Sequence, residues 1–186
     1  MGRPKQVLPY GSTTLVGAVV VAAQASTVDE VVVVTGFHGA EVAAAVRESA
    51  RIVRNPDPAA GNMSSLVTGL NAVGEGRGVV VLLSDMPNVS TEIVDALIAA
   101  VDDSGADAGW VAYSDGSGHP IVLGEHILEE VRDLTGSKAL WRYLMSLATD
   151  RRLVLVVDDS KPVDVNTLDD FENVTRRLRH QEPDQG

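Results

Sequence analysis

Short aliphatic runs alternate with helix-like segments along the chain, and this alternation is the feature that most limits its fold. Residues 31–35, 79–83 and 152–157 are runs typical of buried strands. Weaker strand candidates are residues 51–54, 108–113 and 120–123. Helical patterns fill the intervals: from Ser12 or Thr13 to about residue 24, then over 39–49, 64–73, 90–98, 125–134, 137–147 and 168–178. Such alternation predicts an α/β fold with a mostly parallel sheet and ligands at the carboxyl ends of its strands.

Size and charge limit the classes of function. We expect the 186 residues to form a single domain over residues 1–175, followed by a polar tail over 176–186. The 15 basic and 26 acidic residues give a formal charge of −11, which argues against nucleic-acid or anionic-membrane binding but not against a nucleotide. The absence of cysteine excludes disulfides, thiol catalysis and zinc-thiolate sites. The apolar run over 15–23 is too short to span a bilayer and no targeting signal is visible, so we expect a cytoplasmic protein.

Two carboxylates follow predicted strands. Asp85 comes directly after the run at 79–83, in Ser84-Asp85-Met86-Pro87, and Asp164 follows the run at 152–157. Carboxylates at strand ends suit Mg²⁺, which takes a few protein oxygens together with waters and phosphate oxygens. The alternative is local: Asp85 caps the following turn, and the segment around Asp164 serves to start a helix, with Asn166 or Thr167 as its N-cap.

Three further segments have residues suited to binding. Lys5 after Pro4 is a cation that can bind phosphate, or else an ordinary solvated surface lysine. The glycine-containing segment at 55–66 leads into a helix start that can bind an anion or a base, although Ser64 alone is also explained as a helix cap. His119 in Gly118-His119-Pro120 can contact a substrate or exchange a proton; alternatively, it is a turn residue bound to a local carbonyl.

The order of these segments resembles a known family. The blocks at 1–10, 55–70, 82–87, 118–122 and 162–171 are similar to motifs of the MobA-like nucleotidyltransferases, most of all to the molybdenum-cofactor cytidylyltransferase branch. The resemblance implies a Rossmann-like, doubly wound sheet of the nucleotide-diphospho-sugar transferase type. The first residues resemble only the second half of the signature L-A-A-G-x-S-x-R-M-G-x-P-K-x-L-x-P. We therefore expect the first, central strand to be missing and the start codon to lie upstream. Ser84 in place of glycine and Asn62 before Met63 depart from the family pattern.

The resemblance also implies an activity. It is the Mg²⁺-dependent transfer of a nucleoside monophosphate, CMP from CTP, to a phosphorylated cofactor such as molybdopterin-type molybdenum cofactor, with release of pyrophosphate. The alternatives are a guanylyltransferase of a molybdenum or deazaflavin cofactor, which uses GTP, and a non-catalytic nucleotide-binding remnant. Implied partners are the nucleoside triphosphate, the acceptor and, transiently, a molybdoenzyme or its chaperone.

The family's functional residues carry over to matching positions of this chain. Lys5 and Asp85 are the expected catalytic residues, and Asp85 and Asp164 the expected metal ligands. The acceptor is expected at Gly118, His119 and Pro120. The residues expected to bind the nucleotide are Gly2, Arg3, Pro4, Lys5, Asn55, Gly61, Ser64 and Ser65.

Overall fold

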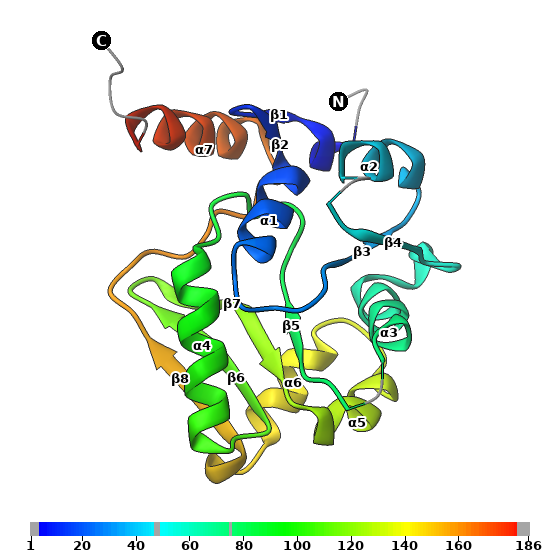
Figure 1. Cartoon of the computed structure of the whole chain (residues 1–186), viewed down its shortest axis with the longest axis vertical. Coiled ribbons are helices and arrows are strands. Elements are labelled where there is room, and N and C mark those ends of the chain that lie inside the picture. The colour runs from blue at the N-terminus through cyan, green and yellow to red at the C-terminus, as the bar shows by residue number, and fades with distance from the viewer. Residues whose placement is uncertain (1–3, 47–48, 75, 182–186) are drawn as a thin grey trace.

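The protein has a mixed α/β fold with mostly parallel strands, as predicted. A computed structural model describes residues 4–46, 49–74 and 76–181 (Figure 1). Gly2 and Arg3, two of the expected nucleotide-binding residues, lie outside the described residues. Within the described part of the chain, no helix is long and apolar enough to cross a membrane.

A four-stranded sheet forms the larger part of the core. Its strand order is β5 (Val79–Val81), β7 (Gly116–Leu123), β6 (Ala108–Tyr113) and β8 (Arg152–Val156). β7 runs antiparallel to both β5 and β6, whereas β6 and β8 are parallel, so β5, β6 and β8 point the same way. The direction of these three strands brings their carboxyl ends to one edge of the sheet, where a ligand site is expected.

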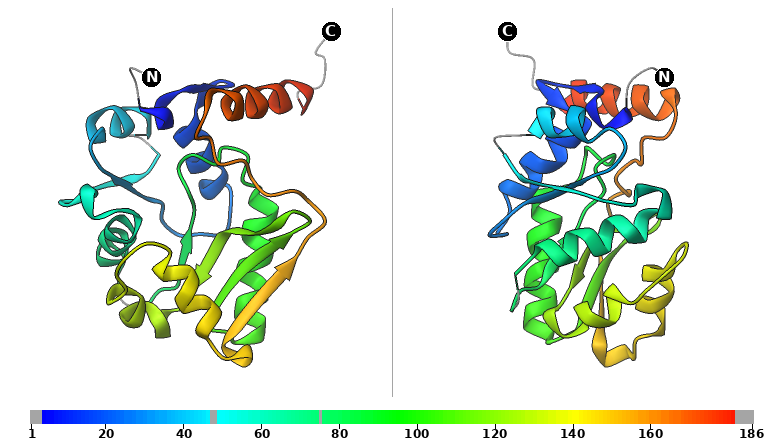
Figure 2. Two further views of the ribbon diagram at one scale, coloured as in Figure 1. Left: turned by 180° about the vertical axis from the view of Figure 1, so that it is seen from behind. Right: turned by 90° about the vertical axis from the view of Figure 1, so that its right-hand side faces the viewer.

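Helices cover both faces of this sheet (Figures 1 and 2). On one face, α4 (Thr91–Ser104) packs Leu97 and Val101 against β6 and β7; Ser90 caps this helix by accepting a hydrogen bond from the Ile93 amide. On the other face lie α5 (Leu128–Arg132) and α6 (Ala139–Ser146). Their buried leucines and valines share a cluster with Trp110 of β6 and with β7, which makes this the main apolar core.

A second, two-stranded parallel sheet pairs β3 (Val32–Thr35) with β4 (Arg51–Arg54). It packs with α1 (Leu15–Gln24), α2 (Gly39–Val46) and α3 (Asn62–Ala72). Val16 and Val20 of α1 belong to the cluster that contains β3 and β4, whereas Val19 packs with Val80 of β5. α3 likewise contacts β3 and shares a cluster with β5. The two sheets are therefore joined through helices on both faces.

The strands nearest the junction are less buried than predicted. Of the three predicted buried runs, that at 152–157 exposes Val154 and Val156, and those at 31–34 and 79–83 are only half-buried, which corrects the prediction. Each strand pairs on one side, β3 with β4 and β5 with β7, and no other strand of the described residues pairs with their second edges. An edge strand lacks a neighbour that would cover its side chains, so an aliphatic run there stays partly accessible.

The remaining elements refine the predicted boundaries. η1 (Lys5–Val7) and the hairpin of β1 (Pro9–Tyr10) and β2 (Thr13–Thr14) precede α1, which Thr14 caps in place of the predicted Ser12 or Thr13. Gly118–Pro120 lie inside β7, not before a strand as predicted. The last helix, α7 (Leu168–Gln181), packs beside the β1–β2 hairpin and continues past residue 175, so the predicted tail is helical as far as Gln181. Three short 3₁₀ helices, η2 (Pro58–Ala60), η3 (Glu125–Ile127) and η4 (Thr149–Arg151), complete the chain.

Candidate active site

Three residues predicted separately for the site meet around one ammonium group. The Lys5 Nζ lies 2.6 Å from Asp85 Oδ2 and 3.7 Å from Asp164 Oδ1. It also donates a hydrogen bond of 2.6 Å to Asn166 Oδ1. The side chains of Lys5, Asp85 and Asp164 are 28%, 18% and 43% exposed, so the cluster is open to a solute on one side. We refer to Lys5, Asp85, Asp164 and Asn166 as the lysine–carboxylate cluster.

Two loops that follow parallel strands bring the carboxylates together. Asp85 lies in the loop after β5, and Asp164 lies in the segment after β8. The Val165 amide donates to the Asp85 carbonyl at 3.0 Å, and the Val163 amide donates to Asn88 Oδ1 at 3.1 Å. Val165 is buried while Asp164 and Asn166 are exposed, as expected for an extended segment whose side chains alternate. Backbone pairing therefore fixes Asp164 and Asn166 on the same side, facing Lys5.

Residues other than the Asn166 side chain cap the start of α7, which leaves that side chain available to contact Lys5. Thr167 Oγ1 accepts a hydrogen bond from the Asp170 amide, and Asp170 Oδ2 accepts hydrogen bonds from the Asn166 and Thr167 amides. This reciprocal pattern is a capping box, which identifies Thr167, and not Asn166, as the N-cap among the two predicted candidates. The Thr167 hydroxyl also donates to Asp170 Oδ2 at 2.8 Å, and this hydrogen bond, followed by those from the two amides, lowers the pKa of the Asp170 carboxyl.

Asn166 is thus a site residue that the sequence reasoning missed. Two signals point to it: Thr167 and Asp170 have capping-box spacing, and Asn166 lies two residues after Asp164 in an extended segment.

A bulge in β7 presents His119 beside the cluster. Trp110 of β6 pairs with Ile121, but the next residue, Val111, pairs with Gly118, so His119 and Pro120 are extra residues in β7. Bulges of this kind redirect a side chain and are common next to active sites. The Tyr113 hydroxyl, whose pKa burial and the Asp159 and Asp115 charges raise to about 12, donates to the His119 carbonyl at 2.7 Å.

The surroundings of His119 keep its ring neutral. Burial lowers the pKa of His119 to about 4, although the Asp164 carboxylate acts in the opposite direction. The ring also contacts Trp141 edge to face, with ring centroids 6.4 Å apart. A neutral imidazole offers one donor and one acceptor to a substrate, so its chemistry here is hydrogen bonding and not charge pairing with a phosphate. The stem of Lys161 lies over Gly118, where an added Cβ would come 3.3 Å from the lysine Cδ.

The residues expected to bind the nucleotide form a separate group after β4. Asn55 is 1% exposed, and its amide is used within the loop: Nδ2 donates to Ser65 Oγ at 3.0 Å, and Oδ1 accepts from the Asp57 amide at 2.9 Å. The Ser64 hydroxyl lies within hydrogen-bonding distance of Asn55 Oδ1 and the Asp57 carbonyl. Gly61, at a φ of +91°, is the N-cap of α3, so Ser64 is not the cap.

These contacts separate two roles within that loop. Asn55 is a buried residue that shapes the loop, whereas Gly61 and Asn62 at the start of α3 are exposed, and the first amides of a helix can in general bind an anion. Pro4 is buried at the start of η1. Among the described residues, no hydrogen bond or ion pair joins this loop to the lysine–carboxylate cluster.

The oxygen set of the cluster fits a hard divalent cation. Asp85, Asp164 and Asn166 offer two carboxylate oxygens and one amide oxygen around a single position. Mg²⁺ and Mn²⁺ favour such oxygen ligands, and Mg²⁺ is usually held by one or two carboxylates plus waters and phosphate oxygens. The described ranges contain no group of three or more His, Cys, Asp or Glu side chains, and this cluster offers two carboxylates, with the Asn166 amide oxygen as the third oxygen.

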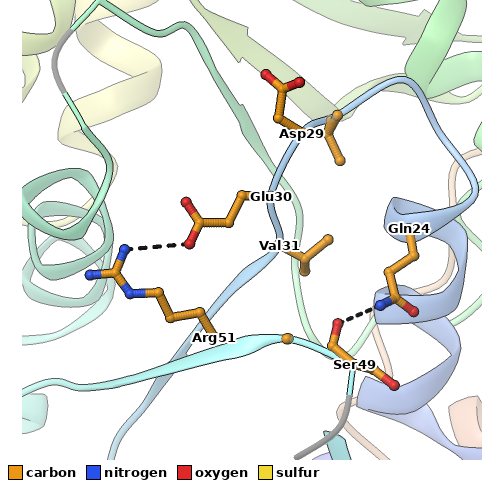
Figure 3. Close-up of a pocket in the computed structure, with 8 residues that line it drawn as sticks. Gln24, Asp29, Glu30, Val31, Ser49 and Arg51 are labelled. Carbon is orange, nitrogen blue, oxygen red and sulfur yellow. Dashed lines mark hydrogen bonds and ion pairs between the residues drawn. The ribbon is translucent and has the colours of Figure 1, made fainter.

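Two surface hollows lie away from these side chains. One, of about 440 Å³, lies where β3 and β4 begin, the opposite end of β4 from Asn55 (Figure 3). Its polar groups pair with each other, Arg51 with Glu30 and Gln24 with the Ser49 carbonyl, as the dashed lines in Figure 3 show. A second hollow, of about 490 Å³, is bounded by Pro87 and Pro162, behind the loops that bear Asp85 and Asp164. Neither includes a residue of the lysine–carboxylate cluster.

Known proteins resemble this chain in sequence and in fold. Residues 1–152 match the family described as the MobA-like NTP transferase domain. Rv0371c from Mycobacterium tuberculosis H37Rv has a similar crystal structure, with 30% identity, a TM-score of 0.84, and coverage of 95% of this chain and 90% of that one. A second structure of that protein is a complex with manganese, at 30% identity, a TM-score of 0.81 and coverage of 93% and 91%.

A nucleotidyl transferase from Methanothermobacter thermautotroptrophicus, Mth528, is 27% identical, with a TM-score of 0.78 and coverage of 95% of this chain and 85% of that one. CMP:2-keto-3-deoxy-manno-octonic acid synthetase complexed with CTP shares the fold at 15% identity, with a TM-score of 0.76 and coverage of 95% and 92%. A comparison with curated protein sequences gives no match.

Proposed function

The chain belongs to the MobA-like NTP transferase family, and from this premise we propose that it is a nucleotidyltransferase that transfers CMP from CTP to a phosphorylated cofactor of the molybdopterin type. The observation that carries the proposal is the convergence of Lys5, Asp85 and Asp164 at the carboxyl edge of the sheet. An ammonium and two carboxylates at one point suit a reaction in which negative charge must be positioned and neutralised. The likeness to a protein crystallised with manganese supports a divalent cation at this point.

The reaction forms one P–O bond and breaks another. An oxygen of the acceptor phosphate attacks the α-phosphorus of the triphosphate in line, and the bond to the β-phosphate oxygen breaks to release pyrophosphate. A bound Mg²⁺ would neutralise charge on the triphosphate as the leaving group departs. Asp85, Asp164 and Asn166 are the residues that would hold it, and Lys5 would pair with phosphate oxygens.

Two groups outside the cluster are assigned to the two substrates. The loop after β4, which Asn55 shapes internally, offers the Gly61 turn and the first amides of α3 to the nucleotide. On the other side, His119 would face the acceptor as a neutral hydrogen-bonding ring next to Trp141. Gly118 and Pro120 would contribute by holding His119 in its bulge.

Pyrophosphate release tests the function. The full chain is incubated with Mg²⁺, a molybdopterin-type acceptor and either CTP or GTP. We expect release with CTP that requires the acceptor. Asp85→Asn should reduce turnover by about 10²–10³-fold, the usual cost of removing a preorganised charged group from such a site. Asp103→Asn, at an exposed position of α4, is the matched control and should retain the wild-type rate.

The remaining outcomes separate the rival functions. Release of pyrophosphate with GTP but not with CTP would overturn the choice of base and indicate a guanylyltransferase. If the protein is folded by circular dichroism and binds CTP but releases no pyrophosphate, the proposed enzymatic function is wrong and the chain is a nucleotide-binding protein.

A further inference from the structure

The Lys5 ammonium lies where a bound divalent cation would lie. Its Nζ is 2.6 Å from both Asp85 Oδ2 and Asn166 Oδ1, and it is drawn toward Asp164 Oδ1 at 3.7 Å. Mg²⁺ ligated by the same oxygens would bind them at about 2.0–2.1 Å. A metal ion and an ammonium that share these oxygens would then be only a few ångströms apart. At such a separation, charges of +2 and +1 repel each other, so the two cations compete for the same oxygens.

We infer that Lys5 is an exchangeable counter-ion, which neutralises the cluster until a divalent cation takes its place on Asp85, Asp164 and Asn166. The inference rests on the proposed function, because that function supplies the metal. Displacement leaves the ammonium free for a phosphate oxygen of the nucleotide. Lys5 therefore opposes metal binding before the nucleotide arrives and supports nucleotide binding once the metal is present.

The side chain of Lys5 is suited to this exchange. The side chain is 28% exposed, so one side of the ammonium is open to solvent. The four flexible methylenes allow the ammonium to move in that direction. The backbone that bears these oxygens, in contrast, is held independently of Lys5. The Val165 backbone amide donates to the Asp85 carbonyl, and the Asn166 backbone amide donates to the Asp170 carboxylate at 3.0 Å. Removal of the lysine side chain therefore leaves the backbone of Asp85, Asp164 and Asn166 in place.

The alternative role for Lys5 is purely structural. The two roles predict opposite changes in the affinity for the metal when Lys5 is removed. If Lys5 only ties the loops together, its loss loosens the oxygen set and weakens metal binding. If Lys5 is exchanged, its loss removes a competitor and strengthens metal binding. Couplings between two ligands of one protein are typically about 5- to 150-fold in affinity, and we expect an effect of that order here.

Titration of the nucleotide-free full chain with Mn²⁺ directly measures whether loss of Lys5 raises or lowers the affinity for the metal. Electron paramagnetic resonance at room temperature reports free Mn²⁺ during a titration, without any need for turnover. We expect Lys5→Met and Lys5→Gln to lower the Kd for Mn²⁺ by about 5-fold or more. Lys5→Arg retains the cation and should bind Mn²⁺ no more tightly than wild type. Lys161→Met is the matched control, because Lys161 lies over Gly118 and has no ion pair or hydrogen bond to the cluster among the described residues.

A second titration tests the other half of the inference. Isothermal titration calorimetry with CTP in the presence of Mg²⁺ should show weaker nucleotide binding by Lys5→Met than by wild type. Tighter Mn²⁺ binding combined with weaker CTP binding supports the exchange. Unchanged or weaker Mn²⁺ binding in both Lys5→Met and Lys5→Gln overturns it, as does unchanged CTP binding.

The same titration separates this inference from the proposed function. If neither wild type nor the folded Lys5 variants bind Mn²⁺, the metal site of the proposed function is wrong and the exchange falls with it. If wild type binds Mn²⁺ as tightly as Lys5→Met, the metal site stands and only the exchange is wrong. Adding Asp85→Asn to Lys5→Met should abolish the gained affinity; retention of that affinity would place the metal on other oxygens and overturn the exchange.

Discussion

At the scale of single residues, the buried position of His119 in the bulge makes the stability of the protein depend on pH. Burial lowers its pKa to about 4 from 6.5, so the unfolded chain binds more protons at this residue between those values. Its contribution to the free energy of unfolding is complete above pH 6.5 and is lost as the pH falls toward 4. A change of this size corresponds to about 3 kcal/mol. Urea unfolding between pH 4 and 7 should show a shallower loss of stability for His119→Gln than for wild type. His126→Gln, at an exposed position of η3, should have the wild-type slope; equal slopes for both variants would contradict the prediction.

At the scale of elements, the contact between α4 and β6 depends on the absence of a side chain at Gly109. A Cβ there would overlap Val101 Cγ2 and come 3.2 Å from Leu97 Cδ1. Gly109→Ala should therefore lower the free energy of unfolding by about 1–3 kcal/mol, the usual cost of overpacking. Gly74→Ala is the matched control, since its Cβ would meet no atom within 4 Å, and it should change stability by less than about 0.5–1 kcal/mol. The midpoint of urea unfolding, at unchanged m-value, measures both. Equal effects of the two substitutions would show that α4 can shift to accommodate the methyl group.

The elements also show how far the sequence predicts this fold. The predicted strands at 51–54 and 108–113 match β4 and β6, because β-branched and aromatic residues between turns are a sufficient local signal. The first half of β7 was missed because Gly116, Ser117 and Gly118 have no strand propensity, and pairing with β6 alone makes them extended. The burial of the runs at 31–34 and 79–83 was overestimated, because the residues of an aliphatic run do not show whether the strand pairs on one side or on both.

The same limits apply to the candidate site. Lys5, Asp85 and Asp164 were identified one by one from their motifs, but their common meeting point depends on hydrogen bonds between two loops far apart in the sequence. The role of Asn166 was missed because Asn is a good N-cap in isolation, and only the reciprocal bonds of Thr167 and Asp170 show that the cap is already provided. Short-range signals therefore predict which residues matter, and long-range pairing decides what each one contacts.

At the scale of the whole molecule, the division of the strands into two sheets predicts uneven local stability. β6 and β7 each pair with strands on both sides, whereas β3 and β4 form a ladder of two strands, which is marginal without support from packed helices. Amide hydrogen exchange, followed by mass spectrometry on peptic fragments, should be slowest in β6 and β7 and faster in β3 and β4. Val42→Ala, in the cluster around β3 and β4, should speed exchange in those two strands and leave β6 and β7 unchanged. Val101→Ala, in the cluster on β6, is the matched substitution and should speed exchange in the four-stranded sheet. If either substitution speeds exchange equally in both sheets, the two sheets open together and the molecule unfolds as one cooperative unit.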